Sequence, residues 1–583
     1  MGDGWLVGTA LSERFPFYTR ANVGEVFPDP VAPLSHSFAF QHADGLGGAE
    51  MGFRNAFVEI GAFDHDEFPP DECVFLGVVG GYCYLNASAM RLLGHRAPGM
   101  TFQDIDDSFF GDAPGVPPFE VQPGDDRPDL TARIGETFHW VLTTESLPDV
   151  LADQQTMNQL RADRPDLSAF SDRELVDRVW ELFDEHFEQL FRRHIYVSML
   201  ASLPVGIITG VSTALGDPGA ALKLLAGLGD VESAAPSMEM WDLGRGVAES
   251  EALTELFDDG PVGLDQRLRV SPDPAVRTWL ADFDRFLVAY GSRGPNEWES
   301  RSPTWETEPD LALAAIDRMR LSPTSSSPYR NHEERALERK RLGEAMAEHL
   351  AGDPETQGQF VAALGASTVF MPGRERTKTN CVKLIHEGRV ALLEWGRRAV
   401  AAGHFPAVGS YGLLTREEQY RFLDDPAGWH EILAEREERY HEVAALREPF
   451  LFVGHPGAMA EYPRRDAIEV EPLAAGDQLP GVAGCPGVAE GRARVVVDSH
   501  DPTALQPGDI LVAPLTDPSW TPLFVPASAV VVDVGAPLSH AIIVSRELGI
   551  PCVVSATDAT KVIPDGSWIR VDGDAGIVSV LEI

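Results

Sequence analysis

Residues 529–554 read AVVVDVGAPLSHAIIVSRELGIPCVV and determine how the C-terminal part of the chain folds. The run of β-branched residues predicts a strand, and Gly535 predicts the turn that ends it. Ser539 then begins a short helix as its N-cap, with His540 in the first turn. Gly549, followed closely by Pro551, ends that helix before a second valine-rich strand. The stretch therefore predicts a strand–turn–helix–strand unit with a histidine at the start of its helix.

His540 is expected beside backbone N–H groups that have no partner inside the helix. The positive end of the helix dipole disfavours an imidazolium there and favours an anion, such as the phosphoryl group of a phosphohistidine. Neutral imidazole is also the nucleophilic form of histidine. The alternative is an N-cap serine followed by an incidental histidine, and Pro33–His36 carries the same four letters, PLSH. The run Arg-Glu-x-Gly-Ile-Pro follows only His540, which favours a functional role for this copy.

The amino-acid composition and the predicted secondary structure change along the chain. Short β-rich runs such as RARVVV, DILVAPL and WIRVDG fill residues 481–583 and predict a small β/α domain with one helix, near 539–548. Residues 454–480 are rich in Pro, Gly and acidic residues and predict a hinge or linker. Residues 1–453 form a large mainly helical domain in this prediction. The fold class is therefore multidomain α+β.

The large domain is expected to have two parts. Residues 1–150 are rich in Gly, Pro and aromatics and predict loops with a few strands and short helices. From about residue 170 the pattern is helical, beginning with the capping box Ser171-x-x-Glu174 and an apolar face. That face is predicted to contain Leu175, Val179, Leu182, Phe183, Phe187, Leu190 and Phe191.

One uncharged stretch, Ile195–Gly216, is long enough to cross a bilayer. It contains Pro204, Gly206, Gly210 and five Ser or Thr residues, and it continues directly from a charged amphipathic segment. We expect two buried core helices that break at Pro204 rather than a membrane span.

Composition excludes several classes of function. The 583 residues include 90 Asp and Glu against 47 Lys and Arg, a net charge of −43, which disfavours binding to nucleic acid or an anionic membrane. The five cysteines are scattered without a CxxC pair, so we expect neither a disulfide framework nor a metal site in this chain. A cytoplasmic protein fits this usage, because its thiols stay reduced.

The stretch GAPLSHAIIVSRELGIPCVV resembles the phosphohistidine segment of the swivelling domain of phosphoenolpyruvate synthase, pyruvate phosphate dikinase and rifampin phosphotransferase. Residues 481–497 and 509–524 resemble the same domain's other strands and loops. The resemblance covers essentially all of 481–583. It implies that His540 carries the phosphoryl group and that Gly535, Ser539 and Arg546 belong to the phosphohistidine loop and its helix.

The large domain resembles, more weakly, the acceptor-binding domain of rifampin phosphotransferase and the matching subunit of phenylphosphate synthase. The resemblance rests on TRANVGEVFPDPVAPL (residues 19–34), YGSRGPNE (290–297) and RERTK (374–378). In the second motif a serine stands where the family usually has histidine, so any role of that histidine is not carried over. The resemblance implies catalytic roles for the third motif and substrate binding by Arg20, Arg293 and Glu297.

The residue types of the third motif suit the binding of a phosphoryl group. Arg374 and Lys378 are four residues apart, so a helix presents both cations on one face, where they could bind an arriving phosphoryl group. Glu375 could orient Arg374 or accept a hydroxyl proton. The alternative is a solvated face with ordinary ion pairs, and for Arg293 and Glu297 the alternative is a structural salt bridge.

The sequence contains no GxxxxGK[ST] phosphate loop and no protein-kinase motif set. Family members usually carry an ATP-grasp domain ahead of the acceptor domain, whereas the acceptor motif begins here at residue 19. The resemblance therefore implies a separate ATP-grasp nucleotide-binding subunit, which would bind most of the ATP and Mg²⁺.

The resulting hypothesis is the phosphohistidine-carrying and acceptor-binding subunit of an ATP-dependent dikinase. The acceptor would be the hydroxyl of a small phenolic compound, for example a hydroxyphenyl ketone such as acetovanillone, with AMP and phosphate as co-products. Abundant aromatic residues such as Phe53, Phe57, Phe63, Trp298 and Trp305 suit such an acceptor, although most are expected in the core. Two alternatives remain: a rifampin-type antibiotic phosphotransferase, and a non-catalytic phosphohistidine regulator without an enclosed pocket beside Lys378.

Overall fold

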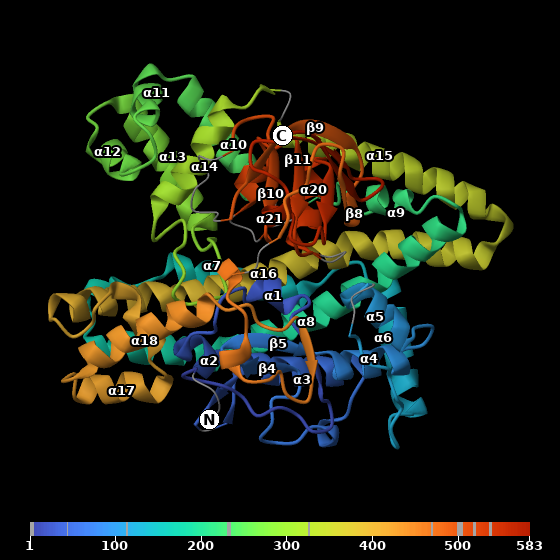
Figure 1. Ribbon diagram of the computed structural model, residues 1–583, viewed down its shortest axis with the longest axis horizontal. Coiled ribbons are helices and arrows are strands. Elements are labelled where there is room, and N and C mark those ends of the chain that lie inside the picture. The colour runs from blue at the N-terminus through green and yellow to red at the C-terminus, as the bar shows by residue number, and fades with distance from the viewer. Residues whose placement is uncertain are drawn as a thin grey trace.

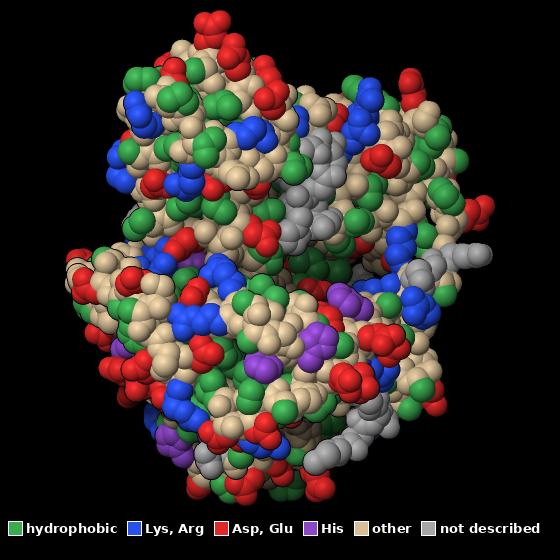
Figure 2. Space-filling view, turned by 90° about the vertical axis from the view of Figure 1, so that its left-hand side faces the viewer, with side chains coloured by type: hydrophobic (Ala, Val, Ile, Leu, Met, Phe, Trp, Pro, Cys, Tyr) green, Lys and Arg blue, Asp and Glu red, His purple; other side chains and the backbone are tan. Residues whose placement is uncertain are grey.

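The computed structural model describes residues 5–43, 45–111, 115–229, 235–324, 327–467, 470–497, 505–516, 520–535 and 539–583. Figure 1 shows two layers: a lower helical body, and an upper layer with a helical lobe beside the C-terminal sheet domain. The helical lobe is residues 235–349, and the C-terminal domain is residues 478–583. Figure 2 shows that one face of the molecule is hollowed where the two layers meet, with hydrophobic side chains in the hollow.

Two long helices form the axis of the helical body. Helix α8 (Asp172–Ala214) packs along α16 (Pro354–Ala401), and α3 (Gly48–Ile60) packs on α8. The Ser171 hydroxyl caps α8 by accepting a hydrogen bond from the Glu174 N–H, as the capping box predicts. All seven apolar residues predicted for the face of α8 are buried, so that prediction is confirmed.

The predicted break at Pro204 is wrong, because α8 continues through this residue. A proline inside a helix removes one hydrogen bond and costs about 3 kcal/mol. Leu200, Pro204 and Ile208 are all buried, and burying each such side chain stabilises the fold by roughly 1.5–3 kcal/mol. Packing against the neighbouring helices therefore outweighs the local preference for a break.

Among the described residues, α8 is long and apolar enough to cross a membrane. Of its most apolar window, 39% is buried inside the protein. The exposed positions include Ser202, Thr209 and Thr213. One such helix is weak evidence for a membrane span, because core helices pass the same test.

The expectation of only short helices before residue 150 is also wrong. Helix α6 spans Pro128–Thr143 and α7 spans Pro148–Ala162. In both helices the proline occupies the first turn, where its missing N–H needs no partner and its fixed φ suits the helix. Each proline starts a helix here, although the Pro-rich composition predicts loops.

A small antiparallel sheet in the helical body joins distant parts of the chain. Its strand order is β4 (Leu76–Val79), β5 (Tyr82–Asn86), β1 (Phe17–Thr19) and β6 (Leu451–Val453). The other elements of the body and its edge are α1 (Val23–Val26), α2 (Pro33–Ala39), β2 (Gln41–His42), β3 (Gly45–Leu46), α4 (Ala87–Arg96), α5 (Phe102–Phe109), α9 (Gly219–Leu224), α17 (Arg416–Asp424) and α18 (Trp429–Ala444).

The helical lobe packs against the C-terminal domain. Its helices are α10 (Ala235–Ala248), α11 (Glu251–Asp258), α12 (Leu264–Val270), α13 (Pro274–Tyr290), α14 (Pro309–Leu321) and α15 (Pro328–His349). Trp241 and Phe283 of the lobe share one hydrophobic cluster with Leu511 and Ile542 of the C-terminal domain. The two parts therefore have a common apolar contact in this structure.

The C-terminal domain is built on an eight-stranded sheet of order β7-β14-β13-β9-β10-β11-β12-β8. The central strands β9 to β12 run parallel to their neighbours, and the outer strands pair antiparallel. The strands are β7 (Gln478–Pro480), β8 (Val482–Cys485), β9 (Val488–Val495), β10 (Ile510–Ala513), β11 (Ala529–Val532), β12 (Cys552–Val554), β13 (Trp568–Asp572) and β14 (Ile577–Glu582). Strand β7 occupies the last three residues of the predicted linker 454–480, so the sheet begins earlier than position 481.

Helix α20 (His540–Leu548) connects β11 to β12 as predicted, and Gly549 ends it with φ of 70°. Two four-residue helices, α19 (Thr521–Phe524) and α21 (Ala559–Val562), accompany it and were not predicted. A helical body with this separate β/α domain confirms the multidomain α+β class.

Candidate functional site

His540 is the first residue of α20, and Ser539 is the N-cap. Strands β10 and β11 are parallel neighbours, so the segments that follow them meet at one edge of the sheet. This arrangement places Thr516, after β10, beside the start of α20: its Oγ1 lies 3.1 Å from His540 Nδ1. The ring of Phe524 packs edge-on against the imidazole at 5.9 Å. The imidazole is therefore oriented by a hydroxyl on one ring nitrogen and by an aromatic ring.

The other residues predicted for the phosphohistidine loop surround this start of α20. A Cβ on Gly535 would lie 2.8 Å from Val554 Cβ and 3.2 Å from Ser539 Oγ, so the turn has no room for a side chain. The buried Ser539 hydroxyl has no hydrogen-bond partner among the described residues. Residues 536–538 of the predicted loop lie outside the described residues.

Arg546 has a supporting position, two turns after His540. It is buried, and its Nε donates to the Gly484 carbonyl at 3.2 Å, which ties α20 to β8. Burial lowers the pKa of its guanidinium to about 10. The described contacts of Arg546 thus hold the helix that carries His540 against the sheet.

Arg374 and Lys378 lie one turn apart on α16 and form the cationic face that the sequence predicts. Arg374 Nη1 donates to Glu375 Oε1 at 2.9 Å. Lys378 Nζ lies 3.2 Å from Glu297 Oε1. Both cationic side chains are 18% exposed, so their charges are only partly screened by water.

Arg293 connects the loop after α13 to the same part of α16. Its guanidinium donates to both carboxylate oxygens of Glu297, at 3.0 and 3.2 Å, and to Thr379 Oγ1 at 2.7 Å. The salt bridge expected as an alternative is therefore present, and Glu297 also pairs with Lys378. The Arg293–Glu297 salt bridge thus holds the loop in place, and through Lys378 it also belongs to the cluster of charges on α16.

The structure brings His540 of the C-terminal domain to this cationic group of the helical body. Burial lowers the pKa of His540 well below its ordinary value, and the positive charges of Lys378, Arg293 and Arg374 lower it further. The imidazole is therefore neutral, which is its nucleophilic form. Two carboxylates accompany the three cations, so the group has a net charge of about +1 and favours an anion.

Arg20 is not placed with this group. Its guanidinium donates to Glu448 Oε1 at 3.0 Å and to the carbonyls of Cys83 at 2.6 Å and Phe27 at 2.9 Å. It is buried beside the Tyr82 ring in the small sheet of the helical body. These contacts are structural, and the predicted substrate-binding role has no support among them.

The sequence motifs miss His194, which lies on α8 opposite Thr377. Its Nδ1 is 3.2 Å from Thr377 Oγ1 and 3.4 Å from Ser198 Oγ. Burial and the charges of Arg374 and Lys378 lower its pKa to about 3. Nothing in the local sequence distinguishes this histidine, because only the packing of α8 on α16 brings it here. By contrast His36, in the second PLSH copy, lies inside α2 and is buried in the core.

Arg389 is a second residue that sequence motifs miss. It is fully buried on α16 and donates to the carbonyls of Glu297 at 3.0 Å, Glu299 at 2.9 Å and Ser300 at 3.2 Å. These bonds hold the loop that presents Arg293 and Glu297. Arg389 therefore positions the loop without being part of the cationic face.

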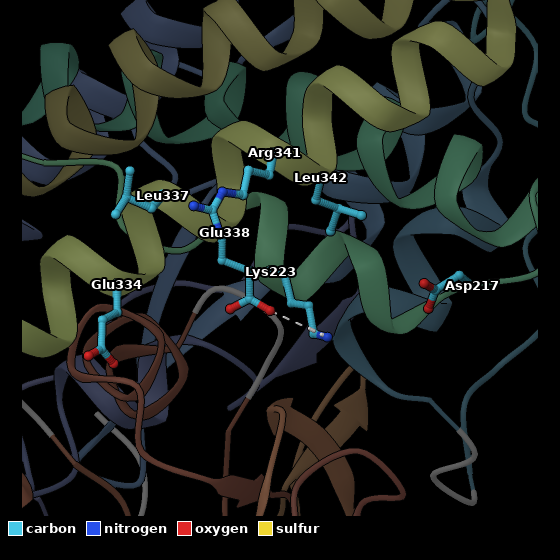
Figure 3. Close-up of a pocket in the computed structure, with 7 residues that line it drawn as sticks. All are labelled: Asp217, Lys223, Glu334, Leu337, Glu338, Arg341 and Leu342. Atoms are coloured by element: carbon cyan, nitrogen blue, oxygen red, sulfur yellow. Dashed lines mark ion pairs between the residues drawn. The ribbon is translucent and has the colours of Figure 1, made fainter.

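Two cavities border this region. A groove of about 540 Å³ lies between α9 and α15, where Lys223 pairs with Glu338 at 3.5 Å (Figure 3). Its lining residues are Asp217, Lys223, Glu334, Leu337, Glu338, Arg341 and Leu342, none of which was predicted as a site residue. A second cavity of about 10 Å³, enough for one water molecule, lies where α20 meets the helical body. It is lined by Leu225, Leu228, Met371, Glu375, Ile543, Arg546 and Glu547.

Neither cavity is lined by Lys378, and the one beside Glu375 is too small for an organic acceptor. Phe53, Phe57 and Phe63 belong to the hydrophobic core and line neither cavity. Neither of these two cavities therefore provides room for an organic acceptor beside Lys378 in the described part of the chain.

Comparison with known proteins matches two segments of the chain. Residues 505–576 match the family "PEP-utilising enzyme, mobile domain", and residues 193–375 match "Rifampicin phosphotransferase fourth domain". The first match runs from β10 to β13 and contains His540, and the second begins inside α8 and ends at Glu375 in α16. His540, Arg293 and Arg374 therefore fall within matched segments, whereas Lys378 lies three residues beyond the end of the second one.

Curated relatives align over longer stretches. The prodigiosin synthesizing transferase PigC of Serratia marcescens is 27% identical over 99% of this chain and 64% of its own length. Rifampicin phosphotransferases of Streptomyces sviceus and Bacillus subtilis are 27% and 29% identical over 70% and 53% of this chain, and over 43% and 35% of their own lengths. The chain thus spans less than two thirds of the length of these relatives. Over the two matched segments the chain is therefore similar to PEP-utilising enzymes with a mobile domain and to rifampicin phosphotransferases.

Proposed function

We propose that this chain carries a phosphoryl group on His540 and transfers it to the hydroxyl group of a small acceptor bound by the helical body. The observation that carries the proposal is the position of α20, which begins with His540: it meets α16 beside Glu375, where the charges of Lys378, Arg293 and Arg374 act on the imidazole. A neutral imidazole facing three cations is a carrier placed at a site that stabilises phosphate. The names of the rifampicin phosphotransferase relatives support a phosphotransferase activity.

The first half-reaction takes place on the imidazole. Because Thr516 engages Nδ1, Nε2 is the nitrogen that we assign as the nucleophile. The N–H groups at the start of α20 and the Ser539 hydroxyl are placed to bind phosphoryl oxygens. Lowering of the pKa keeps the nitrogen unprotonated before attack.

The second half-reaction takes place in the docked form. Arg374 and Lys378 neutralise the oxygens of the phosphoryl group as it leaves His540, and Arg293 adds a third positive charge. Glu375 holds Arg374 in position through their 2.9 Å contact. Docking against the helical body would reduce the access of water to the phosphoryl group, which favours transfer to the acceptor over hydrolysis.

The donor is part of the proposal. We propose an ATP-grasp nucleotide-binding subunit that binds ATP and Mg²⁺ and phosphorylates His540, with AMP and phosphate as co-products. Among the described residues no group of three or more His, Cys, Asp or Glu is placed to hold a metal ion. We therefore propose no Mg²⁺ ligands on this chain.

We further propose a small phenolic acceptor, such as acetovanillone. The aromatic rings of Phe191 and Trp298, beside His194 at 6.2 and 5.7 Å, support an aromatic acceptor. All five cysteines are buried thiols, which supports a cytoplasmic location. A rifampin-type antibiotic acceptor is the alternative that the relatives' names favour.

One observation favours a second candidate, a phosphohistidine regulator that has no small-molecule acceptor. The cavity beside Glu375 holds only about 10 Å³ in the docked form. If the site opens only when the mobile domain moves away, an acceptor could still enter before docking. A regulator would retain its phosphoryl group in the presence of every small hydroxyl compound.

The experiment that tests the proposal uses the full chain and the small donor phosphoramidate. The wild-type chain is expected to gain one acid-labile, alkali-stable phosphoryl group, located on His540 by mass spectrometry. His540→Ala should gain none, and His441→Ala, an exposed histidine on α18, should match the wild type. Label on another side chain overturns the carrier role, and label that no acceptor removes favours the regulator.

A further inference from the structure

His194 has one ring nitrogen, Nδ1, that contacts the hydroxyl groups of Thr377 and Ser198. Thr377 Oγ1 donates its own hydrogen to the Arg374 carbonyl at 2.8 Å. At the 3.2 Å contact with His194 we therefore assign the hydroxyl oxygen as the acceptor and place the ring hydrogen on Nδ1, which also lies 3.4 Å from Ser198 Oγ. In a neutral imidazole the other nitrogen, Nε2, then has a lone pair that can accept a hydrogen bond.

The surroundings of His194 keep the ring neutral. Burial disfavours the imidazolium, and Arg374 and Lys378 on α16 repel a positive charge, so the pKa falls to about 3. The ring stays an acceptor over the whole physiological pH range.

Trp298 supplies a donor beside this acceptor. Its ring lies 5.7 Å from that of His194 and 5.9 Å from that of Phe191, and it is only 4% exposed. Within the described part of the chain, its Nε1–H has no hydrogen-bond partner. Such a buried donor costs about 1–3 kcal/mol when unsatisfied. A polar group of a bound molecule would offset that cost.

We propose that His194 and Trp298 form the subsite for the acceptor: His194 Nε2 accepts the proton of the reacting hydroxyl group, and Trp298 Nε1–H binds a second polar atom of an aromatic acceptor. This assignment rests on the proposed function. The acceptor class is a phenol with a carbonyl or ether oxygen that Trp298 can bind, seated against the rings of Phe191 and Trp298.

The transfer step balances with these groups alone. The hydroxyl oxygen of the acceptor forms a bond to phosphorus while the bond between phosphorus and His540 Nε2 breaks, and the electron pair of that bond stays on the imidazole. The O–H bond breaks and its proton passes to His194 Nε2. Release of the phosphorylated acceptor lets His194 return this proton to solvent.

A weak base is sufficient for this step. The transition state of phosphoryl transfer is loose, so the hydroxyl needs little deprotonation before attack. The arriving phosphoryl group is anionic and offsets the charges of Arg374 and Lys378. His194 therefore becomes more basic at the stage when the proton must move.

The test starts from chains phosphorylated on His540 by phosphoramidate, with the loss of label followed in acetovanillone and, separately, in buffer alone. His194→Gln should carry the same amount of label as the wild type and discharge it about 100-fold more slowly. His186→Gln, a partly buried histidine on the same helix, should discharge at the wild-type rate. Thermal unfolding identifies a variant that does not fold, and His194→Asn then replaces it.

The outcomes separate the two proposals. Equal discharge of wild type and His194→Gln in both arms overturns the role of His194, whereas absence of label on wild-type His540 overturns the proposed function itself. Trp298→Phe keeps the ring and removes the N–H, so it should raise KM for acetovanillone about tenfold and leave hydrolysis unchanged; an unchanged KM overturns its role. If acetovanillone does not accelerate wild-type discharge, the phenolic acceptor is rejected, and with it the subsite of His194 and Trp298.

Discussion

His332 Nδ1 lies 3.2 Å from Glu547 Oε2, an ion pair that joins α15 of the helical lobe to α20, the helix that begins with His540. The same carboxylate accepts a hydrogen bond from the Leu228 N–H at 3.3 Å. Arg335, one turn after His332, donates to the Gly549 carbonyl at 3.4 Å. The C-terminal end of α20 is thus held by polar contacts from α15 and from the segment that follows α9.

Docking of the mobile domain should therefore weaken as pH rises. Glu547 raises the pKa of His332 above its ordinary value, with Glu333 adding to this and Arg339 opposing it. The ion pair is present below the undocked pKa of about 6.5 and is lost as pH rises through the higher docked value. Hydrogen exchange of α20 between pH 5.5 and 8.5 should show faster exchange at high pH.

His332→Ala should remove this pH dependence and shift the docking equilibrium by about two- to fivefold, as for a weak salt bridge. His349→Ala, on an exposed position of the same helix, is the matched control and should retain the wild-type profile. An unchanged profile in His332→Ala would show that the ion pair does not contribute to docking.

Lys378→Ala should separate the two half-reactions. Phosphorylation of His540 by phosphoramidate should proceed normally, because that step does not need the helical body. Discharge should slow by about 10²–10³-fold, the usual effect of removing one group that stabilises developing charge. Phosphohistidine is measured by ³¹P NMR. Lys340→Ala, an exposed lysine of α15, should discharge like the wild type; equal rates in both variants would remove Lys378 from the site.

Gly535→Ala should impair phosphorylation of His540. The new methyl group would lie 2.8 Å from Val554 Cβ, so the turn must shift, at a cost of about 1–3 kcal/mol. Thermal unfolding of the C-terminal domain and the phosphorylation rate should both fall. Gly358→Ala in α16, where a Cβ meets nothing within 4 Å, should be neutral or slightly stabilising. Normal phosphorylation in Gly535→Ala would show that the turn tolerates a side chain.

Arg389→Lys should slow transfer without touching the phosphoryl group. A lysine cannot reproduce the three bonds to the carbonyls of residues 297–300. The loop with Arg293 and Glu297 should loosen, which hydrogen exchange of residues 291–300 would detect. Arg397→Lys, exposed on the same helix, is the control. A rigid loop with slow transfer would contradict this positioning role.

The C-terminal domain could be predicted from the sequence because its signals are local. Ser539 as N-cap, Gly549 as helix end and the valine-rich strands each follow from a few neighbouring residues, and the structure confirms them. The cationic pair on α16 is likewise a matter of spacing within one helix.

The remainder depends on packing that no short stretch of sequence records. Pro204 lies inside a continuous helix because its neighbours are buried. Pro128 and Pro148 each begin a helix in a region whose Pro-rich composition predicts loops. His194 and Arg389 reach the site only through the contact of two long helices and one loop. Arg20 shows the opposite case: its sequence motif resembles that of the family, but the structure does not bring it to the site. Its guanidinium is bonded instead to Glu448 and to the Cys83 carbonyl in the small sheet.

Helix α20 contains both the phosphoryl carrier and the residue that binds α15. His540 and Glu547 are seven positions apart in one rigid element, which corresponds to about 10 Å along its axis. A tilt of about ten degrees around Glu547 would therefore displace the imidazole by roughly 2 Å, more than the tolerance of a reacting geometry. Because α20 is rigid, a change in the protonation of His332 at the Glu547 end can move His540 at the other end. The protonation state of His332 can therefore determine whether the phosphoryl group lies close enough to the acceptor to react.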